Sequence, residues 1–220
     1  MSVIRKREYG SVRLLDVECD APEEWTIGDA THLRVCMPTS YENISEMVSR
    51  GFFLADRLLD VSIALSRSKL DYSKLVRLEP RITSQCRDQI LEIAQRSFPS
   101  DRRFHLSLRP DEIIAQQVLA GWINELPEYY LCEHKGEPIG FLALTGEGNR
   151  RFIHLAAVLE RYRASGAALS LYAAAARDCK NQGIQFLDGR VSSANPAVLN
   201  LYAFLGANFS HPQDVYLKEL

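Results

Sequence analysis

The stretch that says most about the fold of this chain reads Arg161-Tyr162-Arg163-Ala164-Ser165-Gly166-Ala167-Ala168-Leu169-Ser170-Leu171-Tyr172. It follows an apolar run at residues 152–158 and opens an alanine-rich segment, which predicts a strand, a turn of small residues and the start of a helix. The first N–H groups of a helix have no partner within it, and the helix dipole adds partial positive charge there. A phosphate could therefore bind at this turn, where Gly166 keeps side chains away and Arg161 and Arg163 supply cations. The alternative is a strand followed by a helix that serves only for packing.

A second signal lies at residues 191–207, which predict a strand end, a capped helix and a glycine stop. Asn195 suits the N-cap of this helix, Pro196 its first position and Gly206 its exit. Tyr202 lies within the predicted helix. The two signals together indicate alternating strands and helices in the second half of the chain.

These two patterns resemble the two landmarks of the GNAT family of acyl-CoA N-acetyltransferases. The pattern Arg163-x-x-Gly166-x-Ala168 resembles the pyrophosphate loop of that family, and Asn195-x-Ala197-x(4)-Tyr202-x(3)-Gly206 resembles its second landmark. The resemblance implies acetyl-CoA as co-substrate. The residues that it implies in acetyl-CoA binding are Ala157, Val158, Arg161, Arg163, Ala164, Ser165, Gly166, Ala167, Ala168 and Asn195.

The resemblance also implies a direct transfer mechanism. Backbone groups near Ala157 and Val158 would polarise the thioester carbonyl, and the hydroxyl of Tyr202 would protonate the departing CoA thiolate. The leaving thiolate, whose thiol has a pKa of roughly 8–9, can take a proton from a positioned tyrosine whose pKa is near ~10. The alternative for Tyr202 is an aromatic ring packed against the sheet.

The order of predicted elements agrees with the same family. Helices at 84–98 and 111–126 precede a hairpin with its turn at 135–137. A strand at 151–158, a helix at 166–181, a strand at 184–191, a helix at 196–205 and a strand ending at Leu217 follow. We expect the α/β GNAT fold, a mixed and largely antiparallel sheet with flanking helices and strands splayed at the CoA cleft.

The polar stretch at residues 66–74 divides the chain. We expect the GNAT domain over residues 78–220 and a small α/β N-terminal lobe over residues 1–75. The N-terminal part contains no phosphate loop. It is therefore assigned to packing and to shaping the acceptor site.

The segment Arg102-Arg103-Phe104-His105, with Trp122-Ile123-Asn124 downstream, resembles the dTDP-fucosamine acetyltransferase group. Those enzymes acetylate the 4-amino group of a dTDP-linked deoxyamino sugar. The chain lacks the Phe-Phe-Gly opening of that group and the Asp that follows its His. We expect a nucleotide-linked amino sugar as acceptor, with the two arginines on its diphosphate and Phe104 stacked on a base or sugar. His105, with an unperturbed pKa near ~6.5, is the candidate base for the amine proton.

The alternative for this segment is a solvated basic loop with one buried aromatic and a structural histidine. Two other polar residues lie in or just after the strand at 151–158. His154, inside the strand, points either to the core or to the acyl cleft and is assigned to packing. Glu160, which follows the strand, could receive a proton through water and is assigned to solvent.

The composition of the chain limits the kinds of partner that it is expected to bind. The chain has 220 residues and a formal charge of −2, which does not favour nucleic acid or an anionic membrane. No apolar run reaches the ~20 residues of a membrane span, and residues 1–7 are too polar for a signal peptide. Five cysteines lack metal-ligand or CxxC spacing, so we expect reduced thiols, no metal and a cytoplasmic protein.

We therefore expect an enzyme that moves the acetyl group of acetyl-CoA to the amine of a small molecule. A homodimer is left open. A protein or polyamine acetyltransferase is the second enzyme hypothesis. A non-catalytic GNAT module that binds acyl-CoA is the hypothesis from a different class.

Overall fold

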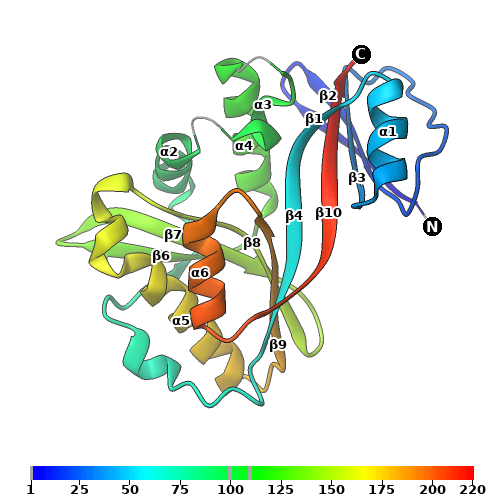
Figure 1. Cartoon of the computed structure of the whole chain (residues 1–220). Helices are drawn as coiled ribbons and strands as arrows, with labels where there is room; N and C mark the ends of the chain where they lie inside the picture. Colours follow the sequence, from blue (N-terminus) through cyan, green and yellow to red (C-terminus); the bar gives the residue numbers. More distant parts are fainter. Residues whose placement is uncertain (1, 99–100, 109–110) are drawn as a thin grey trace.

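A single mixed sheet runs through the molecule (Figure 1). The computed structural model describes residues 2–98, 101–108 and 111–220, without the side chains of Arg102 and Arg103. From one edge to the other, the strands are β1 (Val3–Tyr9), β2 (Val12–Glu18), β3 (His32–Pro38), β10 (Asn208–Glu219), β4 (Phe53–Ala64), β9 (Phe186–Ser192), β8 (Arg150–Val158), β7 (Glu137–Thr145), β6 (Tyr129–His134) and β5 (Arg81–Thr83). The pairs β2–β3 and β8–β9 are parallel, and the other neighbouring strands pair antiparallel.

Helices cover both faces of the central part of this sheet. The helices are α1 (Tyr41–Ser49), α2 (Arg87–Ser97), α3 (Arg102–His105), α4 (Glu112–Glu125), α5 (Ala167–Asn181) and α6 (Pro196–Phe204), with 3₁₀ turns η1 (Tyr72–Leu75) and η2 (Glu160–Ser165). Side chains alternate between the two faces of a strand. On β7, Leu142 therefore packs in one core with α5 and α6, whereas Phe141 packs in another with α2 and α4.

Local hydrogen bonds explain where several helices begin. The side chain of Asp111 accepts from the N–H of Ile114 at the start of α4, and that of Asn195 accepts from Val198 at the start of α6. The predicted helix at 84–98 begins later, at Arg87, because residues 81–83 pair with β6 as β5. The predicted cap of α6 is confirmed.

The N-terminal part has its own small core but not its own sheet. Strands β2 and β3 and helix α1 bury a cluster that includes Val17, Val35 and Met47, and β10 contributes Tyr216 to it. Strand β4, which we had expected inside a lobe over residues 1–75, lies between β10 and β9 in the central sheet. The sheet therefore crosses the expected boundary at residues 75–78.

Strands β8 and β9 separate halfway along their length. They pair only from Arg150–Ile153 on β8 and from Phe186–Gly189 on β9. Opposite β7, the pairing shifts register at His154, so this residue is the extra one of a β-bulge. A bulge bends its strand and disrupts local pairing. The expected splay between two strands is thus present, and Gly189 marks the point where it opens.

In the described part of the chain, no helix is long and apolar enough to span a membrane.

Candidate active site

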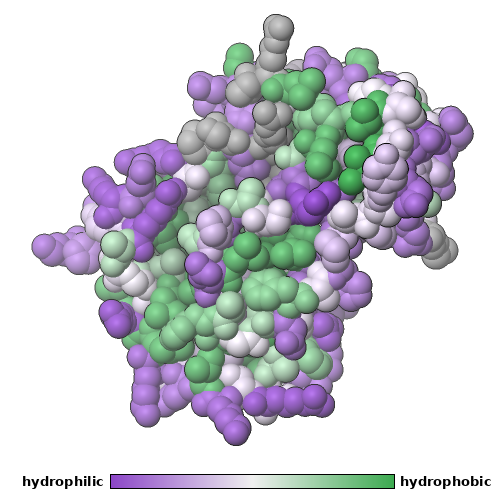
Figure 2. Space-filling view, viewed as in Figure 1, coloured by the Kyte–Doolittle hydropathy of each residue, from purple (hydrophilic) through white to green (hydrophobic). Residues whose placement is uncertain are grey.

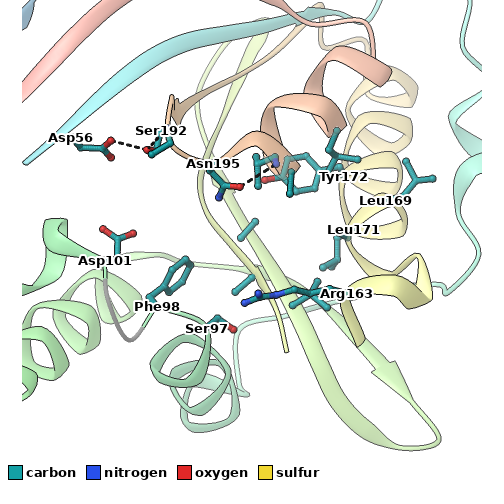
Figure 3. A pocket seen from close by; sticks show the side chains of 18 of the residues that line it. Asp56, Ser97, Phe98, Asp101, Arg163, Leu169, Leu171, Tyr172, Ser192 and Asn195 are labelled. Carbon is teal, nitrogen blue, oxygen red and sulfur yellow. Dashed lines mark hydrogen bonds between the residues drawn. The ribbon is translucent and has the colours of Figure 1, made fainter. Parts of the chain in front are cut away.

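A cavity of about 810 Å³ opens where β8 and β9 separate (Figure 3). Its walls come from β4, β8, β9, α2, α5 and α6, and residues that precede α5 and α6 contribute as well. The molecular surface around α6 and the adjoining part of the sheet is largely hydrophobic, with hydrophilic residues mostly toward the periphery (Figure 2). The cavity therefore offers an apolar channel with polar groups at its ends.

The first end of the cavity is the turn from β8 into α5. η2 ends at Gly166, whose φ of +85° is the left-handed conformation that glycine adopts at little cost. Gly166, Ala168 and Leu169 line the cavity at the first turn of α5. Because the first N–H groups of a helix have no intrahelical partner, this turn can bind an anion.

The two predicted arginines of this turn have different surroundings. Arg163 lines the cavity, and its guanidinium is drawn pointing into it (Figure 3). Arg161 instead forms an ion pair with Glu137 of β7, and its guanidinium carbon lies 5.0 Å from the ring centre of Tyr162. The structure thus supports Arg163 as a cavity cation. It places Arg161 outside the lining.

The small residues of the turn divide in the same way. Ser165 is exposed and its Oγ donates to the carbonyl of Tyr162 at 2.6 Å. Ala164 is exposed as well, and Ala167 is fully buried in the core beneath α5. None of these three belongs to the cavity lining, so they shape the turn from behind.

The middle of the cavity is a strand wall. Ala156, Ala157 and Val158 line it, and β7 pairs with these residues on their other side. Their backbone groups on the β9 side have no strand partner because β8 and β9 have already separated. Such groups can hydrogen-bond to an extended chain inserted into the gap. The predicted positions Ala157 and Val158 are thus where that chain would lie.

The second end of the cavity was not predicted from the sequence. It is formed by Asp56 of β4, Ser192 of β9, and Ser97, Phe98 and Asp101 around the end of α2. Ser192 Oγ donates to Asp56 Oδ1 at 2.7 Å, as does the N–H of Arg57 at 2.8 Å. Two carboxylates at one end of an apolar channel favour a cationic group such as an ammonium. These residues are far apart in the sequence, and no local motif joins them.

The two tyrosines of α5 and α6 are close to each other and to the splay. Tyr202 is only 2% exposed and is not part of the cavity lining. A Cβ placed on Gly189 would lie 2.6 Å from the hydroxyl oxygen of Tyr202, so this phenol packs directly against the point where the strands separate. Tyr172 does line the cavity, and the centres of the two rings are 5.3 Å apart at an interplanar angle of 88°.

The segment 102–105 differs from the expected loop. It forms the short helix α3, and Phe104 is fully buried between Phe98 and Trp122, at ring-centre distances of 5.5 and 5.3 Å. His105 is 2% exposed, and its Nδ1 accepts from the N–H of Asp111 at 3.0 Å. Neither residue lines the cavity.

The expectations of substrate stacking by Phe104 and of proton abstraction by His105 are therefore corrected. Both side chains are held inside the α2–α4 core, as the alternative of a buried aromatic and a structural histidine requires. The side chains of Arg102 and Arg103 lie outside the part that the structure describes. His154 also departs from its assignment to packing, since it is exposed at the bulge and its Nε2 lies 2.6 Å from Thr145 Oγ1.

In the described part of the chain, no cluster of three or more His, Cys, Asp or Glu side chains could hold a metal ion. The described cysteines are all free thiols.

Known protein families and structures give the same picture of the fold. The model of the acetyltransferase (GNAT) family matches residues 87–207, more than half of the chain. Among curated proteins, no sequence relative matches significantly.

Solved structures resemble nearly the whole chain at low sequence identity. A functionally unknown conserved protein from Staphylococcus epidermidis has a TM-score of 0.67 and 14% identity, covering 96% of this chain and 86% of that one. A GCN5-related N-acetyltransferase from Sphaerobacter thermophilus has a TM-score of 0.63 and 13% identity, covering 99% and 76%. A glucosamine N-acetyltransferase region of a fungal multi-domain β-N-acetylglucosaminidase has a TM-score of 0.54 and 13% identity, covering 84% and 25%. At such identities the likeness shows the fold alone.

The chain belongs to the acetyltransferase (GNAT) family. It is an acyl-CoA-dependent N-acetyltransferase with the α/β fold of that family, as its sequence landmarks predicted.

Proposed function

We propose that this enzyme transfers the acetyl group of acetyl-CoA to the primary amine of a small molecule, by direct attack of the amine on the thioester. The observation that carries this proposal is the cavity, which joins an anion-binding helix start at one end to a pair of carboxylates at the other. The strand wall of β8 runs between them. Phosphates, pantetheine arm and amine thus each have a chemically suitable part of one continuous space.

The positions of these groups suggest how the reaction proceeds. The pyrophosphate binds at Gly166 and Arg163, and pantetheine extends along Ala156–Val158 into the splay. The thioester carbonyl then lies against backbone donors, which stabilise negative charge as it develops on oxygen. Holding both reactants in this geometry lowers the entropic cost of their encounter. The thiolate leaves toward the tyrosines of α5 and α6, which can protonate it.

The acceptor end suits an amine. The carboxylates of Asp56 and Asp101 attract an ammonium group from solvent, and the hydroxyls of Ser97 and Ser192 can orient it. The amine attacks only after it loses a proton. The acceptor end therefore determines which amines reach the thioester in a reactive orientation.

Among small-molecule amines, we propose a nucleotide-linked amino sugar as the acceptor, because Arg102 and Arg103 are adjacent in the sequence. Guanidinium groups bind diphosphate oxygens through charge-assisted hydrogen bonds. The remote nucleotide would then supply binding energy that positions the amine.

Calorimetric titration with acetyl-CoA, followed by thiol release with a panel of amines, tests the general proposal. We expect acetyl-CoA to bind and at least one small amine to accelerate thiol release. Acetyl-CoA binding without transfer to any amine would instead indicate the non-catalytic acyl-CoA-binding module. Transfer to peptides or polyamines in preference to amino sugars would indicate the second enzyme hypothesis.

The finer proposal is tested on the acceptor alone. The variant Arg102→Ala/Arg103→Ala should raise the KM for a nucleotide-linked amino sugar and leave acetyl-CoA affinity unchanged. The variant Arg67→Ala/Lys69→Ala removes the same charge from exposed positions elsewhere and serves as the control. Equal activity on the free amino sugar, or an unchanged KM in the first variant, would exclude the nucleotide-linked acceptor while leaving amine acetylation intact.

A further inference from the structure

The family landmark contains Tyr202, yet a different tyrosine reaches the cavity. Tyr172 of α5 lines the cavity, on the side where Asn195 and the start of α6 lie (Figure 3). Tyr202 of α6 lies behind it, in edge-to-face contact with the Tyr172 ring. A group that protonates a leaving thiolate must contact the sulfur or a water next to it. Of these two phenols, Tyr172 is the one that lines the cavity in which the sulfur would lie.

The two phenol rings also contact each other. Their centres lie 5.3 Å apart at an interplanar angle of 88°. Because Tyr172 lines the cavity and Tyr202 does not, Tyr202 packs against the Tyr172 ring from the core.

The surroundings keep both phenols protonated. Burial raises the pKa of Tyr172 to about 12. Burial, followed by the proximity of Tyr172 itself, raises the pKa of Tyr202 well above its ordinary value of 10.0. Both residues therefore carry their protons at neutral pH.

Tyr202 is held in this arrangement by the backbone. Its hydroxyl lies against Gly189, the residue at which β9 loses its pairing with β8. A side chain on residue 189 would occupy the same space, since its Cβ would lie 2.6 Å from that oxygen. The Tyr202 phenol is thereby anchored at the point where β8 and β9 separate.

We propose that the hydroxyl of Tyr172 protonates the CoA thiolate, and that Tyr202 is a positioning residue whose ring packs against Tyr172 and holds it at the cavity wall. As the carbon–sulfur bond of the thioester breaks, its electron pair stays on sulfur and takes the proton of Tyr172. The amide nitrogen loses one proton as its bond to the acetyl carbon forms. That proton returns through water to the Tyr172 oxygen, so the enzyme ends each cycle unchanged.

This inference rests on the proposed function, and kinetics with separate tyrosine variants test it. Tyr172→Phe should lower kcat by roughly 100-fold, as loss of a general acid does, with acetyl-CoA affinity within about twofold of wild type. Tyr202→Phe should lower kcat by about tenfold at most, because the donor remains and only its support against Gly189 changes. The double variant should match Tyr172→Phe alone, since both changes act on one proton transfer. Tyr130→Phe removes another buried phenol oxygen outside the cavity lining and should stay within about twofold of wild type.

A pH profile separates a proton donor from a packing residue. Replacing Tyr172 by 3,5-difluorotyrosine, a nearly isosteric but more acidic phenol, should move the basic limb of the kcat profile to lower pH. The same replacement at Tyr202 should leave that limb close to its wild-type position. This pair of variants also keeps the test open if Tyr172→Phe fails to fold.

The outcomes are distinct. A basic limb that moves with Tyr202 and not with Tyr172, or a loss of roughly 100-fold in Tyr202→Phe alone, overturns the assignment and makes Tyr202 the direct donor. A Tyr172→Phe enzyme as active as wild type also overturns it while leaving the proposed function standing. If the wild-type protein binds acetyl-CoA and acetylates no amine, the proposed function fails and this assignment fails with it.

Discussion

The two ends of the cavity are built in different ways. The proposed acetyl-CoA end comes from a nearly continuous stretch, residues 156–169, with Asn195 of the next helix start added. The proposed acceptor end joins Asp56, Ser97 and Ser192 from elements that are far apart in the chain. A contiguous segment carries its geometry in local caps and turns, whereas a dispersed one depends on how strands pair. The acetyl-CoA end can therefore be recognised as a sequence motif, whereas the acceptor end cannot.

The largest effect that would sharpen this comparison is expected at Phe104. Because its ring is fully buried between Phe98 and Trp122, Phe104→Ala should lower the free energy of unfolding by about 3–5 kcal/mol. Denaturant unfolding measures this change. A variant of unchanged stability with a raised acceptor KM would instead return Phe104 to the acceptor end and contradict the structure.

The next effect is expected at Gly189, the last residue of β9 that pairs with β8. Gly189→Ala would bring a Cβ within 2.6 Å of the Tyr202 hydroxyl oxygen, so it should lower the free energy of unfolding by about 1–3 kcal/mol. It should also lower kcat, because Tyr202 and the Tyr172 ring that it contacts are displaced. The combination with Tyr202→Phe removes the crowded oxygen and should recover most of the lost stability. If the second change recovers nothing, the close contact is not the cause.

The acetyl-CoA end is tested at Gly166. Valine there must adopt a φ of +85°, and its branched side chain would stand over the first N–H groups of α5. Gly166→Val should weaken acetyl-CoA binding tenfold or more, on the order of 1.4 kcal/mol. Calorimetric titration of the folded variant gives the answer. Unchanged affinity would remove the pyrophosphate site from this turn.

The smallest expected effect is on acetyl-CoA affinity and distinguishes Arg163 from Arg161, which the sequence predicted to have the same role. Arg163→Met should weaken acetyl-CoA binding about three- to fivefold, since an exposed ionic contact contributes roughly 1 kcal/mol or less. Arg161→Met should change the affinity less than about twofold, because Arg161 pairs with Glu137. The two variants carry the same change of charge and control for each other. Equal losses would mean that Arg161 leaves Glu137 when acetyl-CoA binds.

The starts of helices α5 and α6 show which features can be predicted from the sequence. Asn195 caps α6 through a hydrogen bond to the N–H three residues on, and Gly166 begins α5 with a positive φ. Both features depend on a few neighbouring residues and on intrinsic backbone preference. The order of strands and helices from residue 129 onward follows from periodicity in the same way. The family, through the resemblance of its two motifs, and the fold could therefore be predicted from the sequence, while the acetyl-CoA site at Gly166 stays a prediction.

The tertiary structure alone decided the rest. Strand β4 shows no local sign that it inserts between β9 and β10, and this pairing brings Asp56 to Ser192. Apolar residues in the segment 102–106 indicate that the segment is buried, but they do not indicate which residues cover it. The sequence pattern therefore also allowed Phe104 to lie in a substrate site. In the sequence, Tyr172 cannot be distinguished from any other aromatic residue of a buried helix. Only the packing of α5 beside the separated strands shows that it lines the cavity. The periodicity of apolar residues predicts that a side chain is buried. It does not predict which residues the side chain contacts, because those contacts join segments that are distant in the sequence. Contacts of this kind form the proposed acceptor end of the cavity.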